Sequence, residues 1–151
     1  MKVSWEKLFA YVTDHRFVVI EELPGPQGLF PGYQVINIQT EKGMSPENLS
    51  NALISVLGEK PKHSSNEIKA RQLRALMAAR AEGGDRLIFM IQCAHLLPLA
   101  TLLAIKSLSE MFDNFGNMTK ISFVLQGDVA ILRNKISKNE SIDLRTYFLE
   151  Q

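Results

Sequence analysis

Residues 87–98 read LIFMIQCAHLLP, and this segment indicates the class of fold more clearly than any other part of the sequence. Its opening run, LIFMI, is entirely apolar, which is typical of a strand buried on both faces of a parallel sheet. The leucine-rich run after Pro98 predicts a buried helix that extends to about Phe112. Gln92, His95 and Pro98 interrupt the apolar residues, so a strand followed by a helix explains the segment better than a membrane span does.

Three more strands are predicted on either side of this stretch. Phe17–Ile20 (FVVI) and residues 121–125 (ISFVL) are buried-type runs, and residues 33–38 (YQVINI) alternate in polarity. Between the first two strands along the chain, residues 23–32 read LPGPQGLFPG, whose prolines and glycines exclude a helix and a regular strand. This composition leaves open whether residues 17–38 form two parallel strands or an antiparallel hairpin.

Helices are predicted between most of these strands. Ser45 is a good N-cap, Pro46 suits the first helical position, and Gly58 ends that helix. Ser64 and Glu67 form a capping-box pattern for a second helix that runs to about residue 81. The other predicted helices are one capped by Ser4 with Trp5, Leu8, Phe9 and Val12 on one face, one over residues 128–136, and a short one over residues 144–149.

The order of these elements predicts an α/β fold, a three-layer sandwich with a mostly parallel central sheet. The length of 151 residues indicates one domain covering residues 1–151. Val56 and Ile68 are among the expected core residues of the two central helices. Ligands of such sheets bind beyond the carboxyl ends of the strands, which here are followed by residues 23–32, 92–95 and 126–128.

The net charge and the single cysteine limit which partners and which cellular compartment are expected. The formal net charge is +1, from 17 basic and 16 acidic residues, so no global charge favours nucleic acid or membrane surfaces. Cys93 is the only cysteine, which rules out an intrachain disulfide and fits a reducing compartment. The amino-terminal residues lack a signal-peptide pattern, so a cytoplasmic location without membrane insertion is expected.

Residues 68–133 resemble one branch of the AAA+ ATPases, which includes ExeA-type secretion ATPases and transposon target-selection ATPases. LRALMAARAEGGDR (73–86) is similar to the helix before the Walker B strand, and 87–98 is similar to that strand followed by Asp-Glu-Ala-His-Leu-Leu-Pro. ISFVLQGDVAILR (121–133) is similar to the sensor 1 strand and the helix after it, and residues 33–58 resemble the second strand and its helix. The resemblance implies a truncated AAA+-like core without the family's C-terminal lid.

The groups that hydrolyse ATP in that family are missing. No G-x-x-x-x-G-K-[ST] phosphate loop occurs, and the glycine-rich residues 23–32 contain no lysine. The acidic pair that organises Mg²⁺ and polarises the attacking water aligns with Gln92 and Cys93, and Gln126 falls near sensor 1. The resemblance with these losses therefore implies a degenerate Walker B site and a pseudo-ATPase, not an enzyme, with no cofactor and no metal.

The leading hypothesis is a non-catalytic AAA+-like domain that acts through protein–protein interaction. It would scaffold or regulate a competent ATPase or a secretion or DNA-transaction complex, or associate with itself. The alternatives are a nucleic-acid accessory factor in transposition, replication or plasmid maintenance, a fragment of a larger ATPase, and an enzyme that uses Cys93 or His95 in unrelated chemistry. The histidines and Cys93 lack metal-ligand spacing such as H-x-x-x-H or C-x-x-C.

The candidate interaction residues fall into three groups, each with an ordinary structural alternative. An apolar pair in the proline-rich segment is either an exposed tip or part of the core. A basic set on the second central helix contacts DNA phosphates or an acidic partner, or is simply a solvated face. One arginine after the sensor-like strand reaches a neighbouring subunit or is an ordinary surface residue. The three groups are Leu29 and Phe30; Lys69, Arg71, Arg74 and Arg80; and Arg133.

Overall fold

The computed structural model describes residues 4–25, 31–62, 65–81, 86–110, 120–139 and 146–149. Its centre is a sheet in the order β2-β3-β4-β1-β5, in which every pairing is parallel. Helices cover both faces, which confirms the predicted three-layer α/β fold. The strands are β1 (Phe17–Ile20), β2 (Tyr33–Gln39), β3 (Arg86–Gln92), β4 (Ile121–Gln126) and β5 (Tyr147–Phe148).

The sheet order settles how the first two strands are arranged. β1 lies between β4 and β5, whereas β2 pairs with β3 at the edge of the sheet. The two strands are therefore parallel and not adjacent, and the hairpin alternative is wrong. The described part of their connection, residues 21–25 and 31–32, contains no helix.

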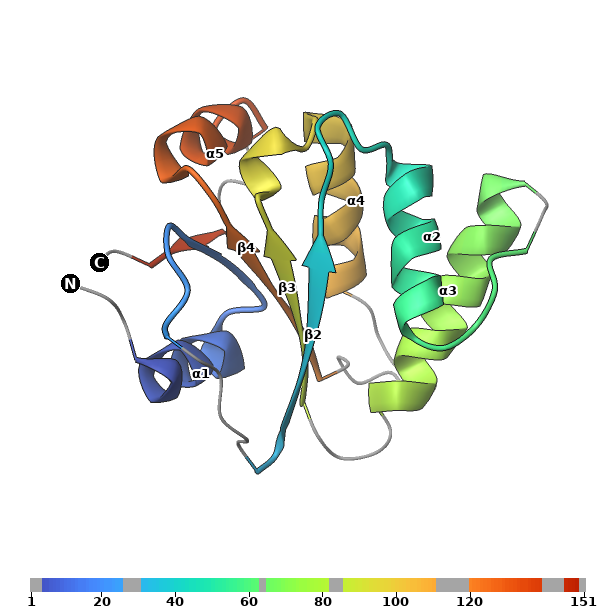
Figure 1. The fold of residues 1–151 in the computed structure, drawn as a ribbon, viewed down its shortest axis with the longest axis horizontal. Helices are drawn as coiled ribbons and strands as arrows, with labels where there is room; N and C mark the ends of the chain where they lie inside the picture. The colour runs from blue at the N-terminus through green and yellow to red at the C-terminus, as the bar shows by residue number, and fades with distance from the viewer. Residues whose placement is uncertain are drawn as a thin grey trace.

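The helices divide unequally between the two faces (Figure 1). α1 (Trp5–Asp14) packs Leu8, Phe9 and Val12 on one face, against Val18 and Met90 among others. The larger core on the other face is formed with α2 (Pro46–Val56), α3 (Asn66–Ala81), η1 (Ala94–Leu96), α4 (Leu99–Ser109) and α5 (Val129–Ile136). Figure 1 shows α1 on one side of the strands and α2, α3 and α4 on the other.

Three phenylalanines form the centre of the larger core. Phe17 and Phe89 are both in register with Phe123, so one aromatic ring lies on each of three adjacent strands. All three are at most 2% exposed, and the rings of Phe89 and Phe123 stack with their centroids 5.1 Å apart. Aromatic pairs of this kind add stabilisation beyond the area they bury.

Two expected core residues are exposed instead. Val56 is 43% exposed and Ile68 is 40% exposed, so both predictions are wrong. On α2, Ile54 is fully buried together with Leu53, so the buried face of the helix is turned toward Ile54 and away from Val56. Ile68 lies in the first turn of α3, whereas Leu73 and Met77 further along the helix are buried.

The ends of two predicted helices also differ. The amino end of α3 is held by Ser65, whose Oγ accepts from the N–H of Ile68 (3.4 Å); Ser64 lies outside the described residues. The predicted helix over residues 144–149 is wrong, because Tyr147–Phe148 is the strand β5, in register with Val18 and Val19. These two residues form a strand because the edge of β1 offers them hydrogen-bond partners. A run of two residues is too short to show the alternation by which a strand is predicted.

Candidate functional site

The carboxyl end of β3 carries Gln92, as expected from the sequence, and its side chain is bonded to β2. Nε2 of Gln39 donates to Oε1 of Gln92 (2.9 Å), and Nε2 of Gln92 is 3.4 Å from Oδ1 of Asn37. Both polar ends of the Gln92 amide are thus engaged by neighbouring amides. A neutral amide held in this way differs from a carboxylate, the group that binds hard cations most strongly.

Cys93 follows directly and turns the chain out of the strand. Its φ of 56° lies in the left-handed region, a costly conformation for a residue with a side chain. Two residues hold this turn. The Cys93 N–H donates to Oε1 of Gln126 (3.1 Å), and the single O–H of Thr40 is shared between the carbonyl oxygens of Gln92 (2.6 Å) and Cys93 (3.0 Å). Sequence reasoning missed Thr40, although a hydroxyl two residues after a predicted strand is a signal for such a contact.

Gln126 joins the carboxyl ends of β4, β3 and β1. While its Oε1 accepts from Cys93, its Nε2 donates to the carbonyl oxygen of Glu21 (2.8 Å), the first residue after β1. The N–H of Gly127 donates to the carbonyl oxygen of Ile20 (3.1 Å) and adds a second tie to β1. The position expected to resemble sensor 1 is therefore part of a hydrogen-bond bridge.

His95 lies against the turn that follows β4. The backbone N–H of Asp128 donates to its Nδ1 (3.2 Å), which places the ring proton of the neutral imidazole on Nε2. A Cβ on Gly127 would lie 2.5 Å from that Nδ1 and 3.1 Å from the His95 backbone nitrogen. Only glycine allows this approach, and Nδ1 is occupied by a backbone donor, so it is not directed at the thiol of Cys93.

Lys135 of α5 also contacts this site, and it was not identified from the sequence. Its Nζ donates to the carbonyl oxygens of His95 (2.6 Å) and Leu97 (2.9 Å), at the end of the short helix η1. A cation is favourable there because the carbonyls at a helix end lack backbone partners. The charge of Lys135 therefore fixes the segment that follows β3.

Replacing Lys135 by methionine should lower the free energy of unfolding by about 1–3 kcal/mol, because two carbonyls lose a charged donor. Urea denaturation followed by circular dichroism measures this change. Lys138→Met is the matched control, since Lys138 is exposed just after the end of the same helix, and its effect should stay within about 0.5 kcal/mol. Equal effects for the two variants would contradict the role assigned to Lys135.

The basic set on α3 does not form one surface. Lys69 is only 8% exposed and points inward, whereas Arg71 is exposed and pairs with Glu67 (2.7 Å). Arg74 is exposed, and Arg80 reaches back toward the carbonyl oxygen of Leu57 at 3.5 Å. Two of the four basic side chains are thus turned toward the protein, which leaves α3 without a continuous basic face.

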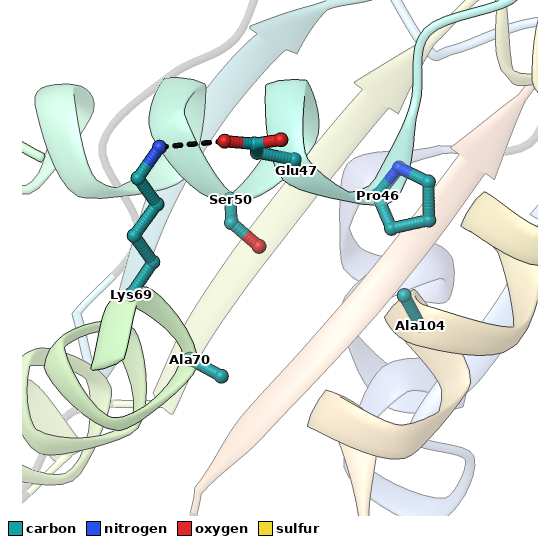
Figure 2. A pocket seen from close by; sticks show the side chains of 6 residues that line it. All are labelled: Pro46, Glu47, Ser50, Lys69, Ala70 and Ala104. Atoms are coloured by element: carbon teal, nitrogen blue, oxygen red, sulfur yellow. Dashed lines mark hydrogen bonds and ion pairs between the residues drawn. The ribbon is translucent and has the colours of Figure 1, made fainter. Parts of the chain in front are cut away.

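Lys69 belongs to a groove of about 210 Å³ between α2, α3 and α4 (Figure 2). Its Nζ lies 2.7 Å from Oε1 of Glu47, and Figure 2 shows this ion pair between α2 and α3. This ion pair links α2 and α3. Because Glu47 neutralises the Lys69 ammonium, that charge is not available to an anionic ligand in the groove. The groove is lined by Pro46, Glu47, Ser50, Lys69, Ala70 and Ala104.

The remaining interaction candidates lie elsewhere. Arg133 is exposed on α5, and its guanidinium stacks on the ring of Phe148 at 4.1 Å from the centroid. This contact attaches α5 to the edge strand β5. Leu29 and Phe30 lie outside the described residues.

A second cavity, of about 260 Å³, lies at the opposite end of the sheet. Burial, with a smaller contribution from Arg86, lowers the pKa of Arg16 in its wall to about 10. Lys106 and Glu110 form an ion pair at 3.4 Å in the same wall, so the charges there largely balance. The lining residues are Asp14, His15, Arg16, Phe17, Lys106, Ser109 and Glu110.

The described residues hold neither a metal-binding cluster nor a helix that could span a membrane. Within those ranges, no group of three or more His, Cys, Asp or Glu side chains is arranged to hold a metal ion. None of the helices in the described part of the chain has the length and apolar character needed to cross a bilayer.

The fold is similar to solved structures of the ORC2 protein of Aeropyrum pernix. Its ADPNP–ADP complexes match with a TM-score of 0.56 and 11% identity over 93% of this chain and 34% of that chain. Its ADP form matches with a TM-score of 0.55 and 12% identity over 77% of this chain and 31% of that chain. This chain therefore spans about a third of the length of ORC2. At these identities the likeness shows that this chain shares its fold with the matched part of ORC2. No protein-family model matches the sequence, and no curated protein matches it.

Proposed function

We propose that this AAA+-like core is a pseudo-ATPase that acts through protein–protein interaction. Hydrogen bonding at the carboxyl ends of β3, β4 and β1 supports the proposal most strongly. Gln92 and Gln126 place neutral amides where phosphoryl transfer requires a carboxylate and a sensor, and both amides are bonded to the protein itself. Both amides would have to give up these protein partners before they could contact a nucleotide.

The chemistry of phosphoryl transfer explains why these replacements matter. Catalysis depends on Mg²⁺ and on donors that neutralise charge developing on the transferred group. Mg²⁺ requires a nearly octahedral set of oxygen ligands that usually includes a carboxylate. Neither Gln92 nor Cys93 carries one, and the backbone N–H of Cys93 is bonded to Gln126.

The start of the β1–β2 connection supports the same proposal. In a phosphate loop, successive backbone N–H groups point at the phosphates and a lysine follows them. Here the carbonyl oxygens of Ile20 and Glu21 are bonded to Gly127 and Gln126, which draws the chain after β1 against β4. The connection has no lysine between residues 21 and 32.

We place the chain in the branch of ExeA-type secretion and transposon target-selection ATPases. Residues 94–98 support this placement, because they form the turn η1 and then lead directly into α4, the order that the branch's Ala-His-Leu-Leu-Pro segment implies. AAA+ subunits associate side by side, so a competent ATPase is the partner we propose. Scaffolding or regulation of that ATPase, in a secretion or DNA-transaction complex, is the corresponding role.

Isothermal titration with ATP and with ADP in the presence of Mg²⁺ tests the loss of nucleotide binding. We expect no binding heat at millimolar nucleotide and no phosphate release in a parallel hydrolysis assay. A competent AAA+ ATPase in the same buffer is the positive control for both readouts. Micromolar affinity for either nucleotide would contradict the proposal, since it would require a phosphate cradle in the β1–β2 connection.

A further inference from the structure

β2 is an edge strand whose outer side is not paired within the described chain. The N–H of Arg86 donates to the carbonyl oxygen of Gly32, and Tyr33 is in register with Arg86. In a parallel ladder this register directs the backbone groups of alternate residues, from Gly32 onward, to β3. The backbone N–H and C=O groups that point away from the sheet therefore belong to Tyr33, Val35, Asn37 and Gln39.

The sequence of this edge lacks the usual protection against pairing. Natural edge strands carry lysine, proline, a bulge or an inward-pointing charge that prevents another strand from adding to them. β2 reads YQVINIQ, which has no charge and no proline, and its register with β3 runs without a bulge from Tyr33 to Gln39. Figure 1 shows β2 in front of the other strands, with no helix across its outer edge.

We propose that this edge binds the β2 edge of a second copy of the chain, antiparallel and about a twofold axis. The axis would pass by Ile36, so that Tyr33 of one copy faces Gln39 of the other and Val35 faces Asn37. The twofold axis repeats both pairs with the two copies exchanged, so there are four facing pairs. Each pair exchanges two backbone hydrogen bonds, which gives about eight across the interface. Isologous pairing of identical patches is the commonest way in which chains form homodimers.

The character of β2 favours a copy of itself over a foreign strand. Antiparallel pairing of identical strands brings their side chains together across the axis, and like charges there would oppose association. None occurs between Tyr33 and Gln39, and the exposed side chains of Gln34, Asn37 and Gln39 are amides, which can donate and accept equally. The two sheets would join into one continuous sheet. This backbone pairing at β2 does not depend on whether the chain binds nucleotide.

Sedimentation equilibrium of the full chain over a range of concentrations tests the proposal. The expected result is a mass that rises with concentration toward twice the chain mass of 17.0 kDa. Asn37→Pro removes an outward N–H without removing a backbone bond to β3, and it gives up only the 3.4 Å side-chain contact with Gln92. It should therefore leave the fold intact and keep the chain monomeric. A wild-type chain that stays monomeric at high micromolar concentration would overturn the proposal, as would a folded proline variant that still dimerises.

Two lysine variants test the same interface in case the proline variant does not fold. Asn37→Lys introduces the residue that natural edges use for protection, and it should weaken dimerisation at least tenfold. Asn134→Lys makes the same chemical change at an exposed position on α5 and should leave dimerisation unchanged. Circular dichroism confirms that each variant is folded. Equal dimerisation constants for the two lysine variants would place the interface elsewhere and reject β2 as the contact.

Discussion

Replacing Phe123 by alanine should lower the free energy of unfolding by about 3–5 kcal/mol, as expected for deletion of a fully buried aromatic ring. Phe123 is 0% exposed and lies on the strand between those of Phe17 and Phe89. Its removal leaves a cavity under α4 and α5 and eliminates the stacked ring contact with Phe89. Because small domains are stable by only about 5–15 kcal/mol, this single change should leave the chain close to unfolding.

Urea denaturation monitored by circular dichroism and by the fluorescence of Trp5 measures the effect at two places in the molecule. Phe123→Leu is the matched control, since it keeps most of the apolar volume and should cost less than about 1.5 kcal/mol. A loss for Phe123→Ala no larger than that of the leucine variant would show that the aromatic row is not the centre of the core.

Replacing Gly127 by alanine is expected to cost about 1–3 kcal/mol, because overpacking a close contact forces neighbouring groups to move. The new Cβ would meet Nδ1 of His95 at 2.5 Å, and behind it the His95 and Ala94 backbone nitrogens at 3.1 and 3.3 Å. The ring of His95 can rotate away, but the backbone of η1 is held by Lys135. The substitution should therefore also break the Asp128 N–H bond to His95.

The double variant His95→Ala/Gly127→Ala separates the ring contact from the backbone contact. Removing the ring should recover part of the loss, so that the two substitutions are less than additive in the free energy of unfolding. Gly25→Ala is the control, since a Cβ at that position would have no atom within 4 Å and its effect should stay within about 0.5 kcal/mol. Strict additivity of the two changes would mean that His95 does not contact Gly127.

Strands with strong local patterns could be predicted from the sequence. Phe17–Ile20 was placed with its observed bounds, and β3 and β4 extend only a residue or so beyond their predicted ranges. Ser45, Pro46 and Gly58 bounded α2 because caps and breakers act through local backbone geometry. The order of the strands, by contrast, depends on pairing between distant segments, which no local pattern contains.

The candidate site was predicted only in outline. Gln92, Cys93 and Gln126 were placed at the carboxyl ends of the strands, where they lie, but their partners were not foreseen. Thr40 and Lys135 were missed because each acts on a backbone carbonyl of a segment far away in the sequence. β5 was missed for a related reason. Its two residues form a strand only because they pair with β1, which lies far away in the sequence.

The position of β1 has a consequence for the order in which the chain acquires its structure. Among the strands of the described residues, β1 is made first, yet its neighbours, β4 and β5, are made last. Contacts between residues so far apart in the chain form slowly, because a long loop must close first. Val18 and Val19 therefore remain without either sheet neighbour until β4 has been made, and a nascent chain that stops before residue 121 has neither of the two strands that flank β1.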